Sequence, residues 1–291
     1  MYIAGCYVIA TFALIVCLYP LLYTLFVSLC TEDEWIARNG LLLFFPSNPS
    51  FAAYIKIFGT GSYVLRAAGI SLARTVAGTV LGVALTAAVG YVLSREELPG
   101  RKVYTYIILF TIFFSGGLIP TYMVVKEMNL INSFWSMVIP PLISTWNVLI
   151  FRQFFTGLPK DIVEAAKVDG VNEAQMLYKI ILPMSKSVFA AIGLFTVVGH
   201  WNSWFDALIY IDVSRSDIWP LQLYTMINFN NVSQINEGRL QDIQGALTGR
   251  DISPLGIRMA LTIVTFLPVL IVYPFFQKYF TKGVYLGAVK G

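Results

Sequence analysis

Apolar residues along this chain fall into long runs separated by shorter polar stretches. A helix needs roughly 20 apolar residues to cross about 30 Å of hydrocarbon, and six runs meet that length. They cover about 5–30, 67–93, 103–125, 133–151, 185–211 and 257–277. The first run has no basic segment before it and is too long for a signal peptide. Since backbone polar groups in lipid must be satisfied within each segment, the pattern predicts an all-α integral membrane protein with six spans in one domain, 1–291.

Composition supports a membrane protein and excludes several other classes. Charged residues make up 12% of the chain and hydrophobic residues 57%, whereas a soluble domain carries about 25% charge. The net charge of +4 is too small to indicate a nucleic-acid-binding protein. The three cysteines and single histidine have no metal-type spacing, so no metal site is expected. No P-loop sequence is present, so the chain is not expected to hydrolyse ATP itself.

The basic residues predict the orientation of the spans. Eleven lysines and arginines lie in the connections that include 94–102, 152–186 and the end of the chain. Eight lie in the connections on the opposite side of the membrane, which are longer in total. Basic residues concentrate on the cytoplasmic side. This places both termini, the loop 153–184 and the tail 278–291 in the cytoplasm, and the loop 212–256 outside.

The loop 153–184 is too polar to span and carries helix signals. Pro159 suits the first turn of a helix, residues 160–168 are good helix formers, and Gly170 stands where that helix must end. Asn172 and Gln175 have the spacing of a capping box for a second helix that would run to Pro183. The loop is therefore predicted to be two short helices around a turn.

Two interpretations of this pair of helices stay open on the residues alone. Ala165 and Ala166 would leave a flat patch for another backbone, which favours a docking elbow. Glu164 has Lys167 one turn away, and an ordinary i, i+3 ion pair would explain it in a solvated connector.

The fifth predicted span ends in a polar and aromatic cluster, which contains His200, Trp201, Asn202, Trp204 and Asp206. Ionisable groups at membrane depth usually face a cavity or a partner, and indole rings with amides and carboxylates suit sugar recognition. An interfacial aromatic belt is the alternative. In the first outer loop, Ser50 as N-cap before an apolar stripe at 51, 54, 55 and 58 predicts either a surface helix or packing on the spans.

The polar loop also resembles a known family motif. Its seven specified positions match the EAA motif of binding-protein-dependent ABC importer permeases: Glu164-Ala165-Ala166, Gly170, Ile180 and Leu182-Pro183. The chain is similar to the carbohydrate branch, which includes the maltose permease subunits. Trp201-Asn202, Trp219-Pro220-Leu221 and the final 287–291 resemble that branch too. Within the branch, the sequence most resembles permeases for complex oligosaccharides, including the second permease subunit of a bacterial alginate importer.

The resemblance implies a type I ABC importer permease with six spans and a coupling helix between spans 4 and 5. Residues implied to couple to the ATPase are Glu164, Ala165, Ala166, Asp169, Gly170, Ile180, Leu182 and Pro183, and the tail residues Lys290 and Gly291 would contact it. The substrate pathway would include Trp201, Asn202, Trp204 and Asp206.

The implied partners are a second homologous permease, two cytoplasmic ABC ATPase subunits, an external sugar-binding protein and the lipid of a bacterial inner membrane. The chain would bind no cofactor and catalyse no reaction, while ATP and Mg²⁺ would be used by the partner ATPase. Two alternatives remain: a permease of the same kind for a non-sugar solute, and an ion-coupled secondary transporter, for which only Arg74, His200 and Asp206 offer ionisable groups at depth.

Overall fold

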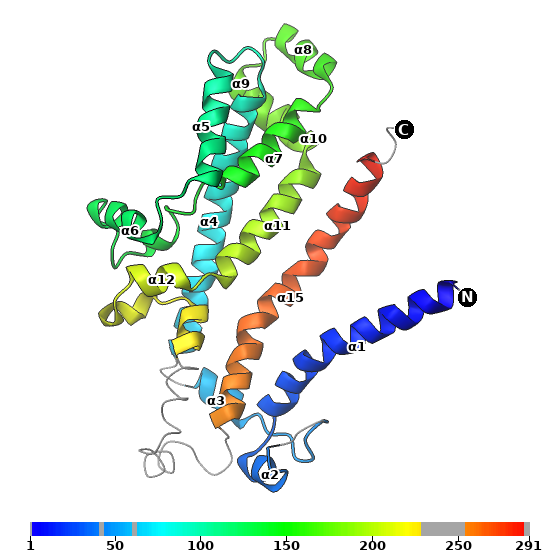
Figure 1. Cartoon of the computed structure of the whole chain (residues 1–291), viewed down its shortest axis with the longest axis vertical. Helices are drawn as coiled ribbons and strands as arrows, with labels where there is room; N and C mark the ends of the chain where they lie inside the picture. Colours follow the sequence, from blue (N-terminus) through cyan, green and yellow to red (C-terminus); the bar gives the residue numbers. More distant parts are fainter. Residues whose placement is uncertain (1, 41–43, 60–62, 228–253, 288–291) are drawn as a thin grey trace. The chain divides into compact units, whose positions relative to one another are not determined.

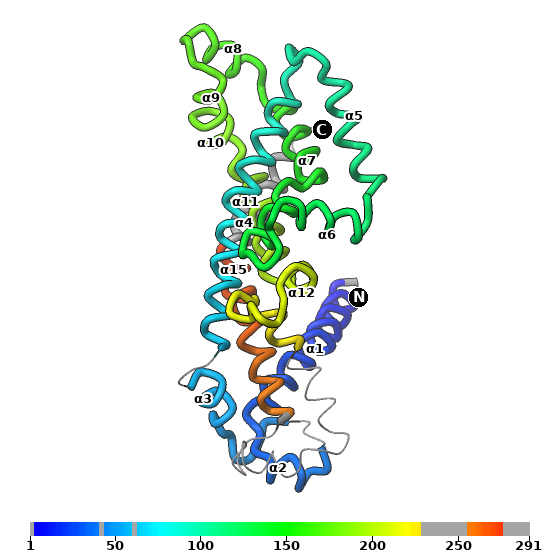
Figure 2. Tube along the Cα trace, turned by 90° about the vertical axis from the view of Figure 1, so that its left-hand side faces the viewer, coloured from blue at the N-terminus to red at the C-terminus, as the bar shows by residue number. Residues whose placement is uncertain are grey.

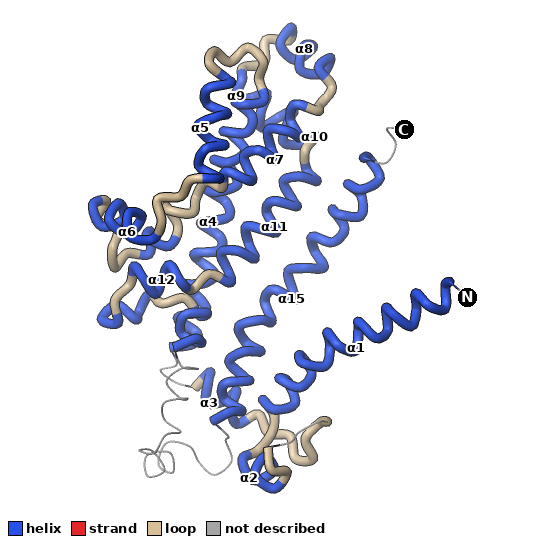
Figure 3. Tube along the Cα trace, in the orientation of Figure 1, coloured by secondary structure: helices blue, strands red, loops and turns tan. Residues whose placement is uncertain are grey.

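The computed structural model describes residues 2–40, 44–59, 63–227 and 254–287, and all regular structure in those ranges is helical (Figure 3). The long helices are α1 (Tyr2–Ser28), α4 (Tyr63–Ser94), α5 (Arg101–Phe113), α6 (Leu118–Glu127), α7 (Thr145–Thr156), α11 (Lys186–Asn202) and α15 (Pro254–Gly287). The short ones are α2 (Glu32–Ala37), α3 (Ala52–Phe58), η1 (Phe134–Met137), α8 (Lys160–Val168), α9 (Glu173–Gln175), η2 (Met176–Ile181), α10 (Leu182–Met184), α12 (Phe205–Tyr210) and η3 (Val213–Ile218). The all-α prediction is confirmed.

The chain divides into two compact units. The first comprises Met1–Ala68 and Leu221–Pro268, and the second comprises Gly69–Pro220 and Val269–Gly291. In the first unit, α1 is apolar all round and its side chains from Ile3 to Leu21 are exposed, as expected of a helix that lipid covers.

Near the end of α1 the first unit has a small core. Val27 and Cys30 are buried against Trp35, Leu255 and Met259. The adjacent Ser28 hydroxyl lies 2.7 Å from the hydroxyl of Tyr54 in α3. These contacts join α1, the segment after it, α3 and the beginning of α15.

The structure corrects the predicted cap of α3. Phe51 is the N-cap residue, although the Ser50 hydroxyl does accept a hydrogen bond from the Ala52 N–H at 3.2 Å. The predicted stripe is largely exposed, with Phe51 at 64% and Ile55 at 72%. The face of α3 that packs on the protein instead carries Ala53 and Ile57.

The second unit is built around a core that joins α4, α7, the 153–184 loop and α11. Its buried members are Ala87, Tyr91, Phe151, Phe155, Ala166, Met176, Ile181, Val188 and Ile192. Gly90 allows α4 to approach α7 closely, since a Cβ there would lie 2.6 Å from the Phe151 Cβ and 3.1 Å from the Val148 oxygen. Figures 1 and 2 place α8, α9 and α10 at one end of this unit.

Three described helices are long and apolar enough to cross a membrane: Ile3–Ser28, Tyr63–Ser94 and Leu255–Phe275. Two bent pairs also qualify if each is one crossing. Arg101–Phe113 with Leu118–Glu127 bends by 117°, and Glu173–Met184 with Lys186–Asn202 bends by 87°. The first bend lies between α5 and α6, where Gly117 has a φ of +84°.

The predicted helix over 133–151 is not continuous. The 3₁₀ helix η1 ends at Met137, and α7 begins only at Thr145, capped by the Ser144 hydroxyl, which accepts from the Asn147 N–H at 3.4 Å. Pro140 and Pro141 lie in the gap, and proline removes a helix donor and clashes with the preceding turn. The helical part of the predicted fifth span likewise ends at Asn202, and α12 follows as a separate turn.

Candidate functional site: the Glu164–Pro183 elbow

The elbow is the loop 153–184, which contains the motif from Glu164 to Pro183, and its first complete helix is closed at its end by a glycine. α8 covers Lys160–Val168, with Pro159 at the N-cap rather than in the first turn. Gly170 has a φ of +75° and donates its N–H to the Lys167 oxygen at 3.1 Å, while the Val171 N–H reaches the Ala166 oxygen at 3.1 Å. This pair of bonds is a Schellman motif, which favours glycine at the left-handed position. The predicted turn at Gly170 is confirmed.

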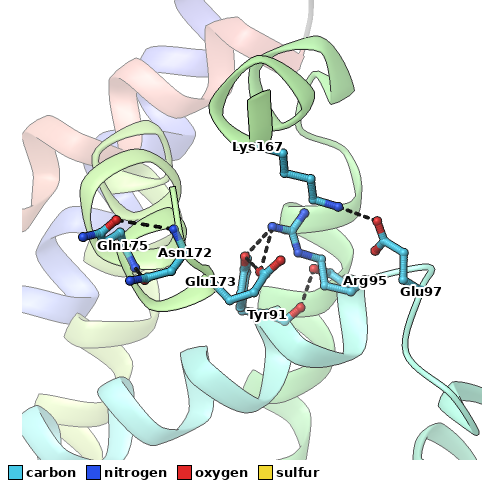
Figure 4. Close-up of polar contacts among 8 residues, drawn as sticks. Tyr91, Arg95, Glu97, Lys167, Asn172, Glu173 and Gln175 are labelled. Atoms are coloured by element: carbon cyan, nitrogen blue, oxygen red, sulfur yellow. Dashed lines mark hydrogen bonds and ion pairs between the residues drawn. The ribbon is translucent and has the colours of Figure 1, made fainter. Parts of the chain in front are cut away.

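The second half of the elbow begins with the predicted capping box. The Asn172 side chain accepts from the Gln175 N–H at 2.8 Å, and the Gln175 side chain accepts from the Asn172 N–H at 3.4 Å (Figure 4). The chain then continues through α9, the π-helical segment η2 and α10 to Met184. A bend of 87° separates this segment from α11.

Polar contacts fasten the elbow to the end of α4, as Figure 4 shows. The Tyr91 hydroxyl donates to the Glu173 carboxylate, and Arg95 donates both to the Tyr91 hydroxyl and, at 3.2 Å, to Glu173. The Arg95 guanidinium also lies 4.5 Å from the centre of the Tyr91 ring. The hydrogen bond from Tyr91 lowers the pKa of the Glu173 carboxyl.

Two lysines of α8 form further ion pairs with the turn after α4. Lys167 Nζ donates to Glu97 at 2.6 Å, and Lys160 Nζ donates to Glu96 at 2.9 Å. The hydrogen bond from Lys167 lowers the pKa of Glu97, and that from Lys160 lowers the pKa of Glu96. Because these pairs are exposed, each stabilises only weakly, but together they set the position of α8 relative to α4.

Glu164 forms no ion pair within the described residues, although its charge acts on Lys160 one turn earlier on α8. The i, i+3 pair with Lys167 is not formed, because Lys167 is bonded to Glu97 instead. Within the part of the chain that the structure describes, Glu164 makes no hydrogen bond or ion pair, and its side chain is exposed. It borders a cavity of about 150 Å³ between α8 and the end of α4. The carboxylate is therefore free to meet a partner's cation.

The two alanines have different roles. Ala165 is exposed, whereas Ala166 is 6% exposed and belongs to the core of the second unit. The expected flat patch is thus formed by Ala165 alone. Among the other motif residues, Asp169, Gly170, Leu182 and Pro183 are exposed and Ile180 is half-buried.

The predicted pathway cluster contains a buried ion pair. Arg74, whose side chain is 1% exposed, pairs with Asp206, which is 21% exposed. Arg74 also donates to the Ser203 backbone oxygen at 3.0 Å. The second Asp206 oxygen accepts from the Ser203 hydroxyl and the Ala207 N–H, both at 2.9 Å. Both carboxylate oxygens are therefore engaged within the chain, and the pair joins α4 to the break between α11 and α12.

The other pathway candidates differ in exposure. Trp201 is buried, Asn202 is exposed and Trp204 is half-buried. The ring of His200 fills the space beside Gly78, where a Cβ would meet it directly. The predicted tail residues Lys290 and Gly291, and most of the loop 212–256, lie outside the described residues. No group of metal-ligating side chains is found within the described ranges.

A family model matches residues 98–285, which is more than half of the chain and includes the elbow. Its description is "Binding-protein-dependent transport system inner membrane component". The chain belongs to this family. It is 36% identical over 280 residues to the polygalacturonan/rhamnogalacturonan transport system permease protein YtcP of Bacillus subtilis, covering 96% of this permease and 94% of that protein. It is 37% identical over 272 residues to protein LplC of the same organism, covering 94% and 89%.

A solved structure supports the same fold. The permease matches a chain from the crystal structure of a bacterial ABC transporter involved in the import of the acidic polysaccharide alginate, with a TM-score of 0.85 and 27% identity. The match covers 96% of this permease and 95% of that chain. The permease therefore has the ABC importer permease fold, as the motif resemblance implied.

Sequence reasoning missed the residues that hold the elbow. Their contacts join partners that lie 70 positions apart in the pair Glu97–Lys167 and 82 positions apart in the pair Tyr91–Glu173, and no local pattern connects them. The one available signal was the charged cluster Arg95-Glu96-Glu97 directly after a membrane-type run.

Proposed function

We propose that this permease forms half of the translocation pathway of an ATP-driven importer and receives its energy through the elbow. The observation that carries this proposal is the exposed Glu164, which forms no ion pair, on an elbow bonded to the end of α4, in a chain that belongs to the binding-protein-dependent permease family. Glu164 and Ala165 form the contact surface for a separate cytoplasmic ATPase. Asp169, Gly170, Leu182 and Pro183 complete the exposed part of the elbow.

The contacts of the elbow suit the transmission of a force. The Schellman turn and the capping box fix the angle between α8 and α9, and the Tyr91–Arg95–Glu173 contacts join the elbow to α4. Core residues Ala166 and Met176 join it to α7 and α11. A movement of the ATPase against Glu164 would therefore move α4 and α11 together. The ATP and Mg²⁺ are bound by the partner, and this chain supplies no catalytic group.

The proposed membrane topology has six crossings with both termini cytoplasmic. α5 with α6 forms the bent third crossing, the broken segment from η1 to α7 forms the fourth, and α11 begins the fifth. A second homologous permease completes the pathway, two ATPase subunits bind from the cytoplasm, Lys290 and Gly291 reach them, and an external binding protein delivers the solute.

The proposed solute is an oligosaccharide that carries uronic acid units. Support comes from the names of relatives: one is a polygalacturonan/rhamnogalacturonan permease at 36% identity, and a structural neighbour belongs to an importer of the acidic polysaccharide alginate. In the pathway, Asn202 and Trp204 would meet the sugar directly. Trp201 and Asp206 would support them, because Trp201 is buried and Asp206 is bonded to Arg74.

A reconstituted complex tests the coupling role. The complex contains the permease, its companion permease, the ATPase and the binding protein, and the variants are Glu164→Lys and the matched control Glu127→Lys, an exposed glutamate at the end of α6. We expect Glu164→Lys to abolish uptake and ATPase stimulation by loaded binding protein, and Glu127→Lys to leave both unchanged. Intact uptake with Glu164→Lys and normally bound ATPase would refute the assignment.

The solute is tested separately in the same vesicles. We expect uptake of galacturonate oligosaccharides and no uptake of arabino-oligosaccharides, the solute named for relatives at 26% and 27% identity. The reverse preference would contradict the acidic-sugar proposal and would leave the coupling proposal standing.

A further inference from the structure

A second and larger cavity lies between α5 and α7, in the same unit as the elbow. It has a volume of about 620 Å³. Its polar wall comes from the turn before α5, the first turns of α5 and one residue of α7, and consists of Glu96, Arg101, Lys102, Thr105, Tyr106 and Arg152. None of these residues except Glu96 borders the cavity beside Glu164.

The cations of this wall have spare hydrogen-bond donors. The Arg152 side chain makes no hydrogen bond or ion pair with the described residues, and its Nε is buried without an acceptor. Lys102 has no partner in the described ranges either. Arg101 uses its Nε for the Leu93 oxygen at 2.9 Å, which leaves its two terminal nitrogens. A buried guanidinium nitrogen without an acceptor is costly, so the wall suits an anion with several oxygens.

The acid of the wall does not cancel these charges. Glu96 is already bonded to Lys160 at 2.9 Å, on the side of the turn that faces α8. Three basic side chains therefore face the cavity against one carboxylate that has its own cation. The free N–H groups at the amino end of α5 add to the positive potential. Gly100, the N-cap residue, offers them no side-chain hydrogen bond.

The wall continues into an apolar surface. Val103, Tyr106, Ile107 and Phe110 are spaced i, i+3, i+4 and i+7 along α5, and they are 60%, 69%, 57% and 58% exposed. Tyr106 belongs both to this stripe and to the cavity. A ligand that fills the site would thus meet cations at one end and an exposed apolar helix face at the other.

We propose that this cavity binds the headgroup of an anionic phospholipid, with the acyl chains lying along the α5 stripe. Arginine binds phosphate oxygens in a bidentate manner, and basic pockets between membrane helices suit lipid headgroups on the cytoplasmic side. The proposal rests on the proposed topology, which places the beginning of α5 at the cytoplasmic face of the membrane, and it does not depend on the transported solute or on the ATPase contact.

Native mass spectrometry of the full-length permease, purified in detergent, tests this site. The measurement is the retention of added phosphatidylglycerol relative to phosphatidylcholine. The test variants are Lys102→Gln, which changes an exposed side chain, and the double change of Lys102 and Arg152 to Gln. The control changes Lys126 and Lys186 to Gln, two exposed lysines outside the cavity. A third arm adds inorganic phosphate.

We expect phosphatidylglycerol retention to fall roughly five-fold for each cation removed, because a basic residue near an anionic lipid surface contributes about 1 kcal/mol. The control should retain the lipid as the unchanged permease does, and phosphate should not displace it. Equal losses in the control and test variants would overturn the proposal. Displacement by phosphate would show a site for a free anion and would overturn the lipid assignment.

Discussion

Replacing Asp206 with asparagine should destabilise the second unit far more than a similar change at the surface. Asparagine keeps the oxygen that accepts from the Ser203 hydroxyl and the Ala207 N–H. It removes the negative charge that faces Arg74, whose side chain is only 1% exposed. The variant therefore leaves a buried guanidinium without its counter-ion, while the packing around it is nearly unchanged.

The expected loss follows from this burial. Removing one partner of a buried ion pair costs about 3–5 kcal/mol. Because Asp206 is 21% exposed and partly hydrated, the lower end applies, and we expect a loss of about 3 kcal/mol. Replacing both residues by apolar ones, Arg74→Met with Asp206→Leu, should cost less than Asp206→Asn alone, since no isolated charge remains.

The assay is the free energy of unfolding of the purified permease in mixed micelles, measured by denaturant titration. The matched control is Asp212→Asn, since Asp212 accepts from the Asn132 side chain at 2.6 Å in an exposed position. It should lose less than about 1 kcal/mol. If Asp206→Asn and Asp212→Asn lose the same free energy, the buried ion pair does not stabilise the break between α11 and α12.

Three other changes test the close contacts of the fold and the elbow. Gly90→Ala should destabilise by about 1–3 kcal/mol, because its Cβ would enter the α7 backbone, whereas Gly69→Ala, with open space around it, should not destabilise. Gly170→Ala should cost about 1–2 kcal/mol through its positive φ alone, since no atom lies within 4 Å of the new Cβ, and should speed amide exchange in α8. Glu97 has a lowered pKa, so its stabilising contact is complete above the usual glutamate pKa and is lost as the pH falls through the lowered value. At neutral pH, the amides of α8 should therefore be better protected from hydrogen exchange in the unchanged permease than in Glu97→Gln. The difference should vanish in acid.

Local signals made the elbow predictable from sequence. Gly170 ends α8, and Asn172 with Gln175 begins the next helix, through bonds that span only three to five residues. Short-range chemistry of this kind can be read from spacing alone. The pairing of Lys167 with Glu97 could not be read in this way, because it depends on the fold bringing α8 to the turn after α4, 70 positions away along the chain.

Hydropathy was less reliable for the membrane segments. It predicted one helix over 133–151, since the run is apolar, but a hydropathy sum does not register the backbone effect of Pro140 and Pro141. Nor does hydropathy show that Asp206, predicted to lie in the pathway, has an internal partner in Arg74. Only the fold reveals such a partner.

The most direct test of the central claim is a cross-linking measurement at the elbow in intact cells. A photoreactive residue replaces Ala165, which is exposed on α8, and in a control it replaces Val213, which is 77% exposed after α12. The account predicts that position 165 cross-links to a separate ATPase subunit and that position 213 does not. Cross-linking of the ATPase from position 213 instead, or from neither position in an assembled transporter, would contradict it.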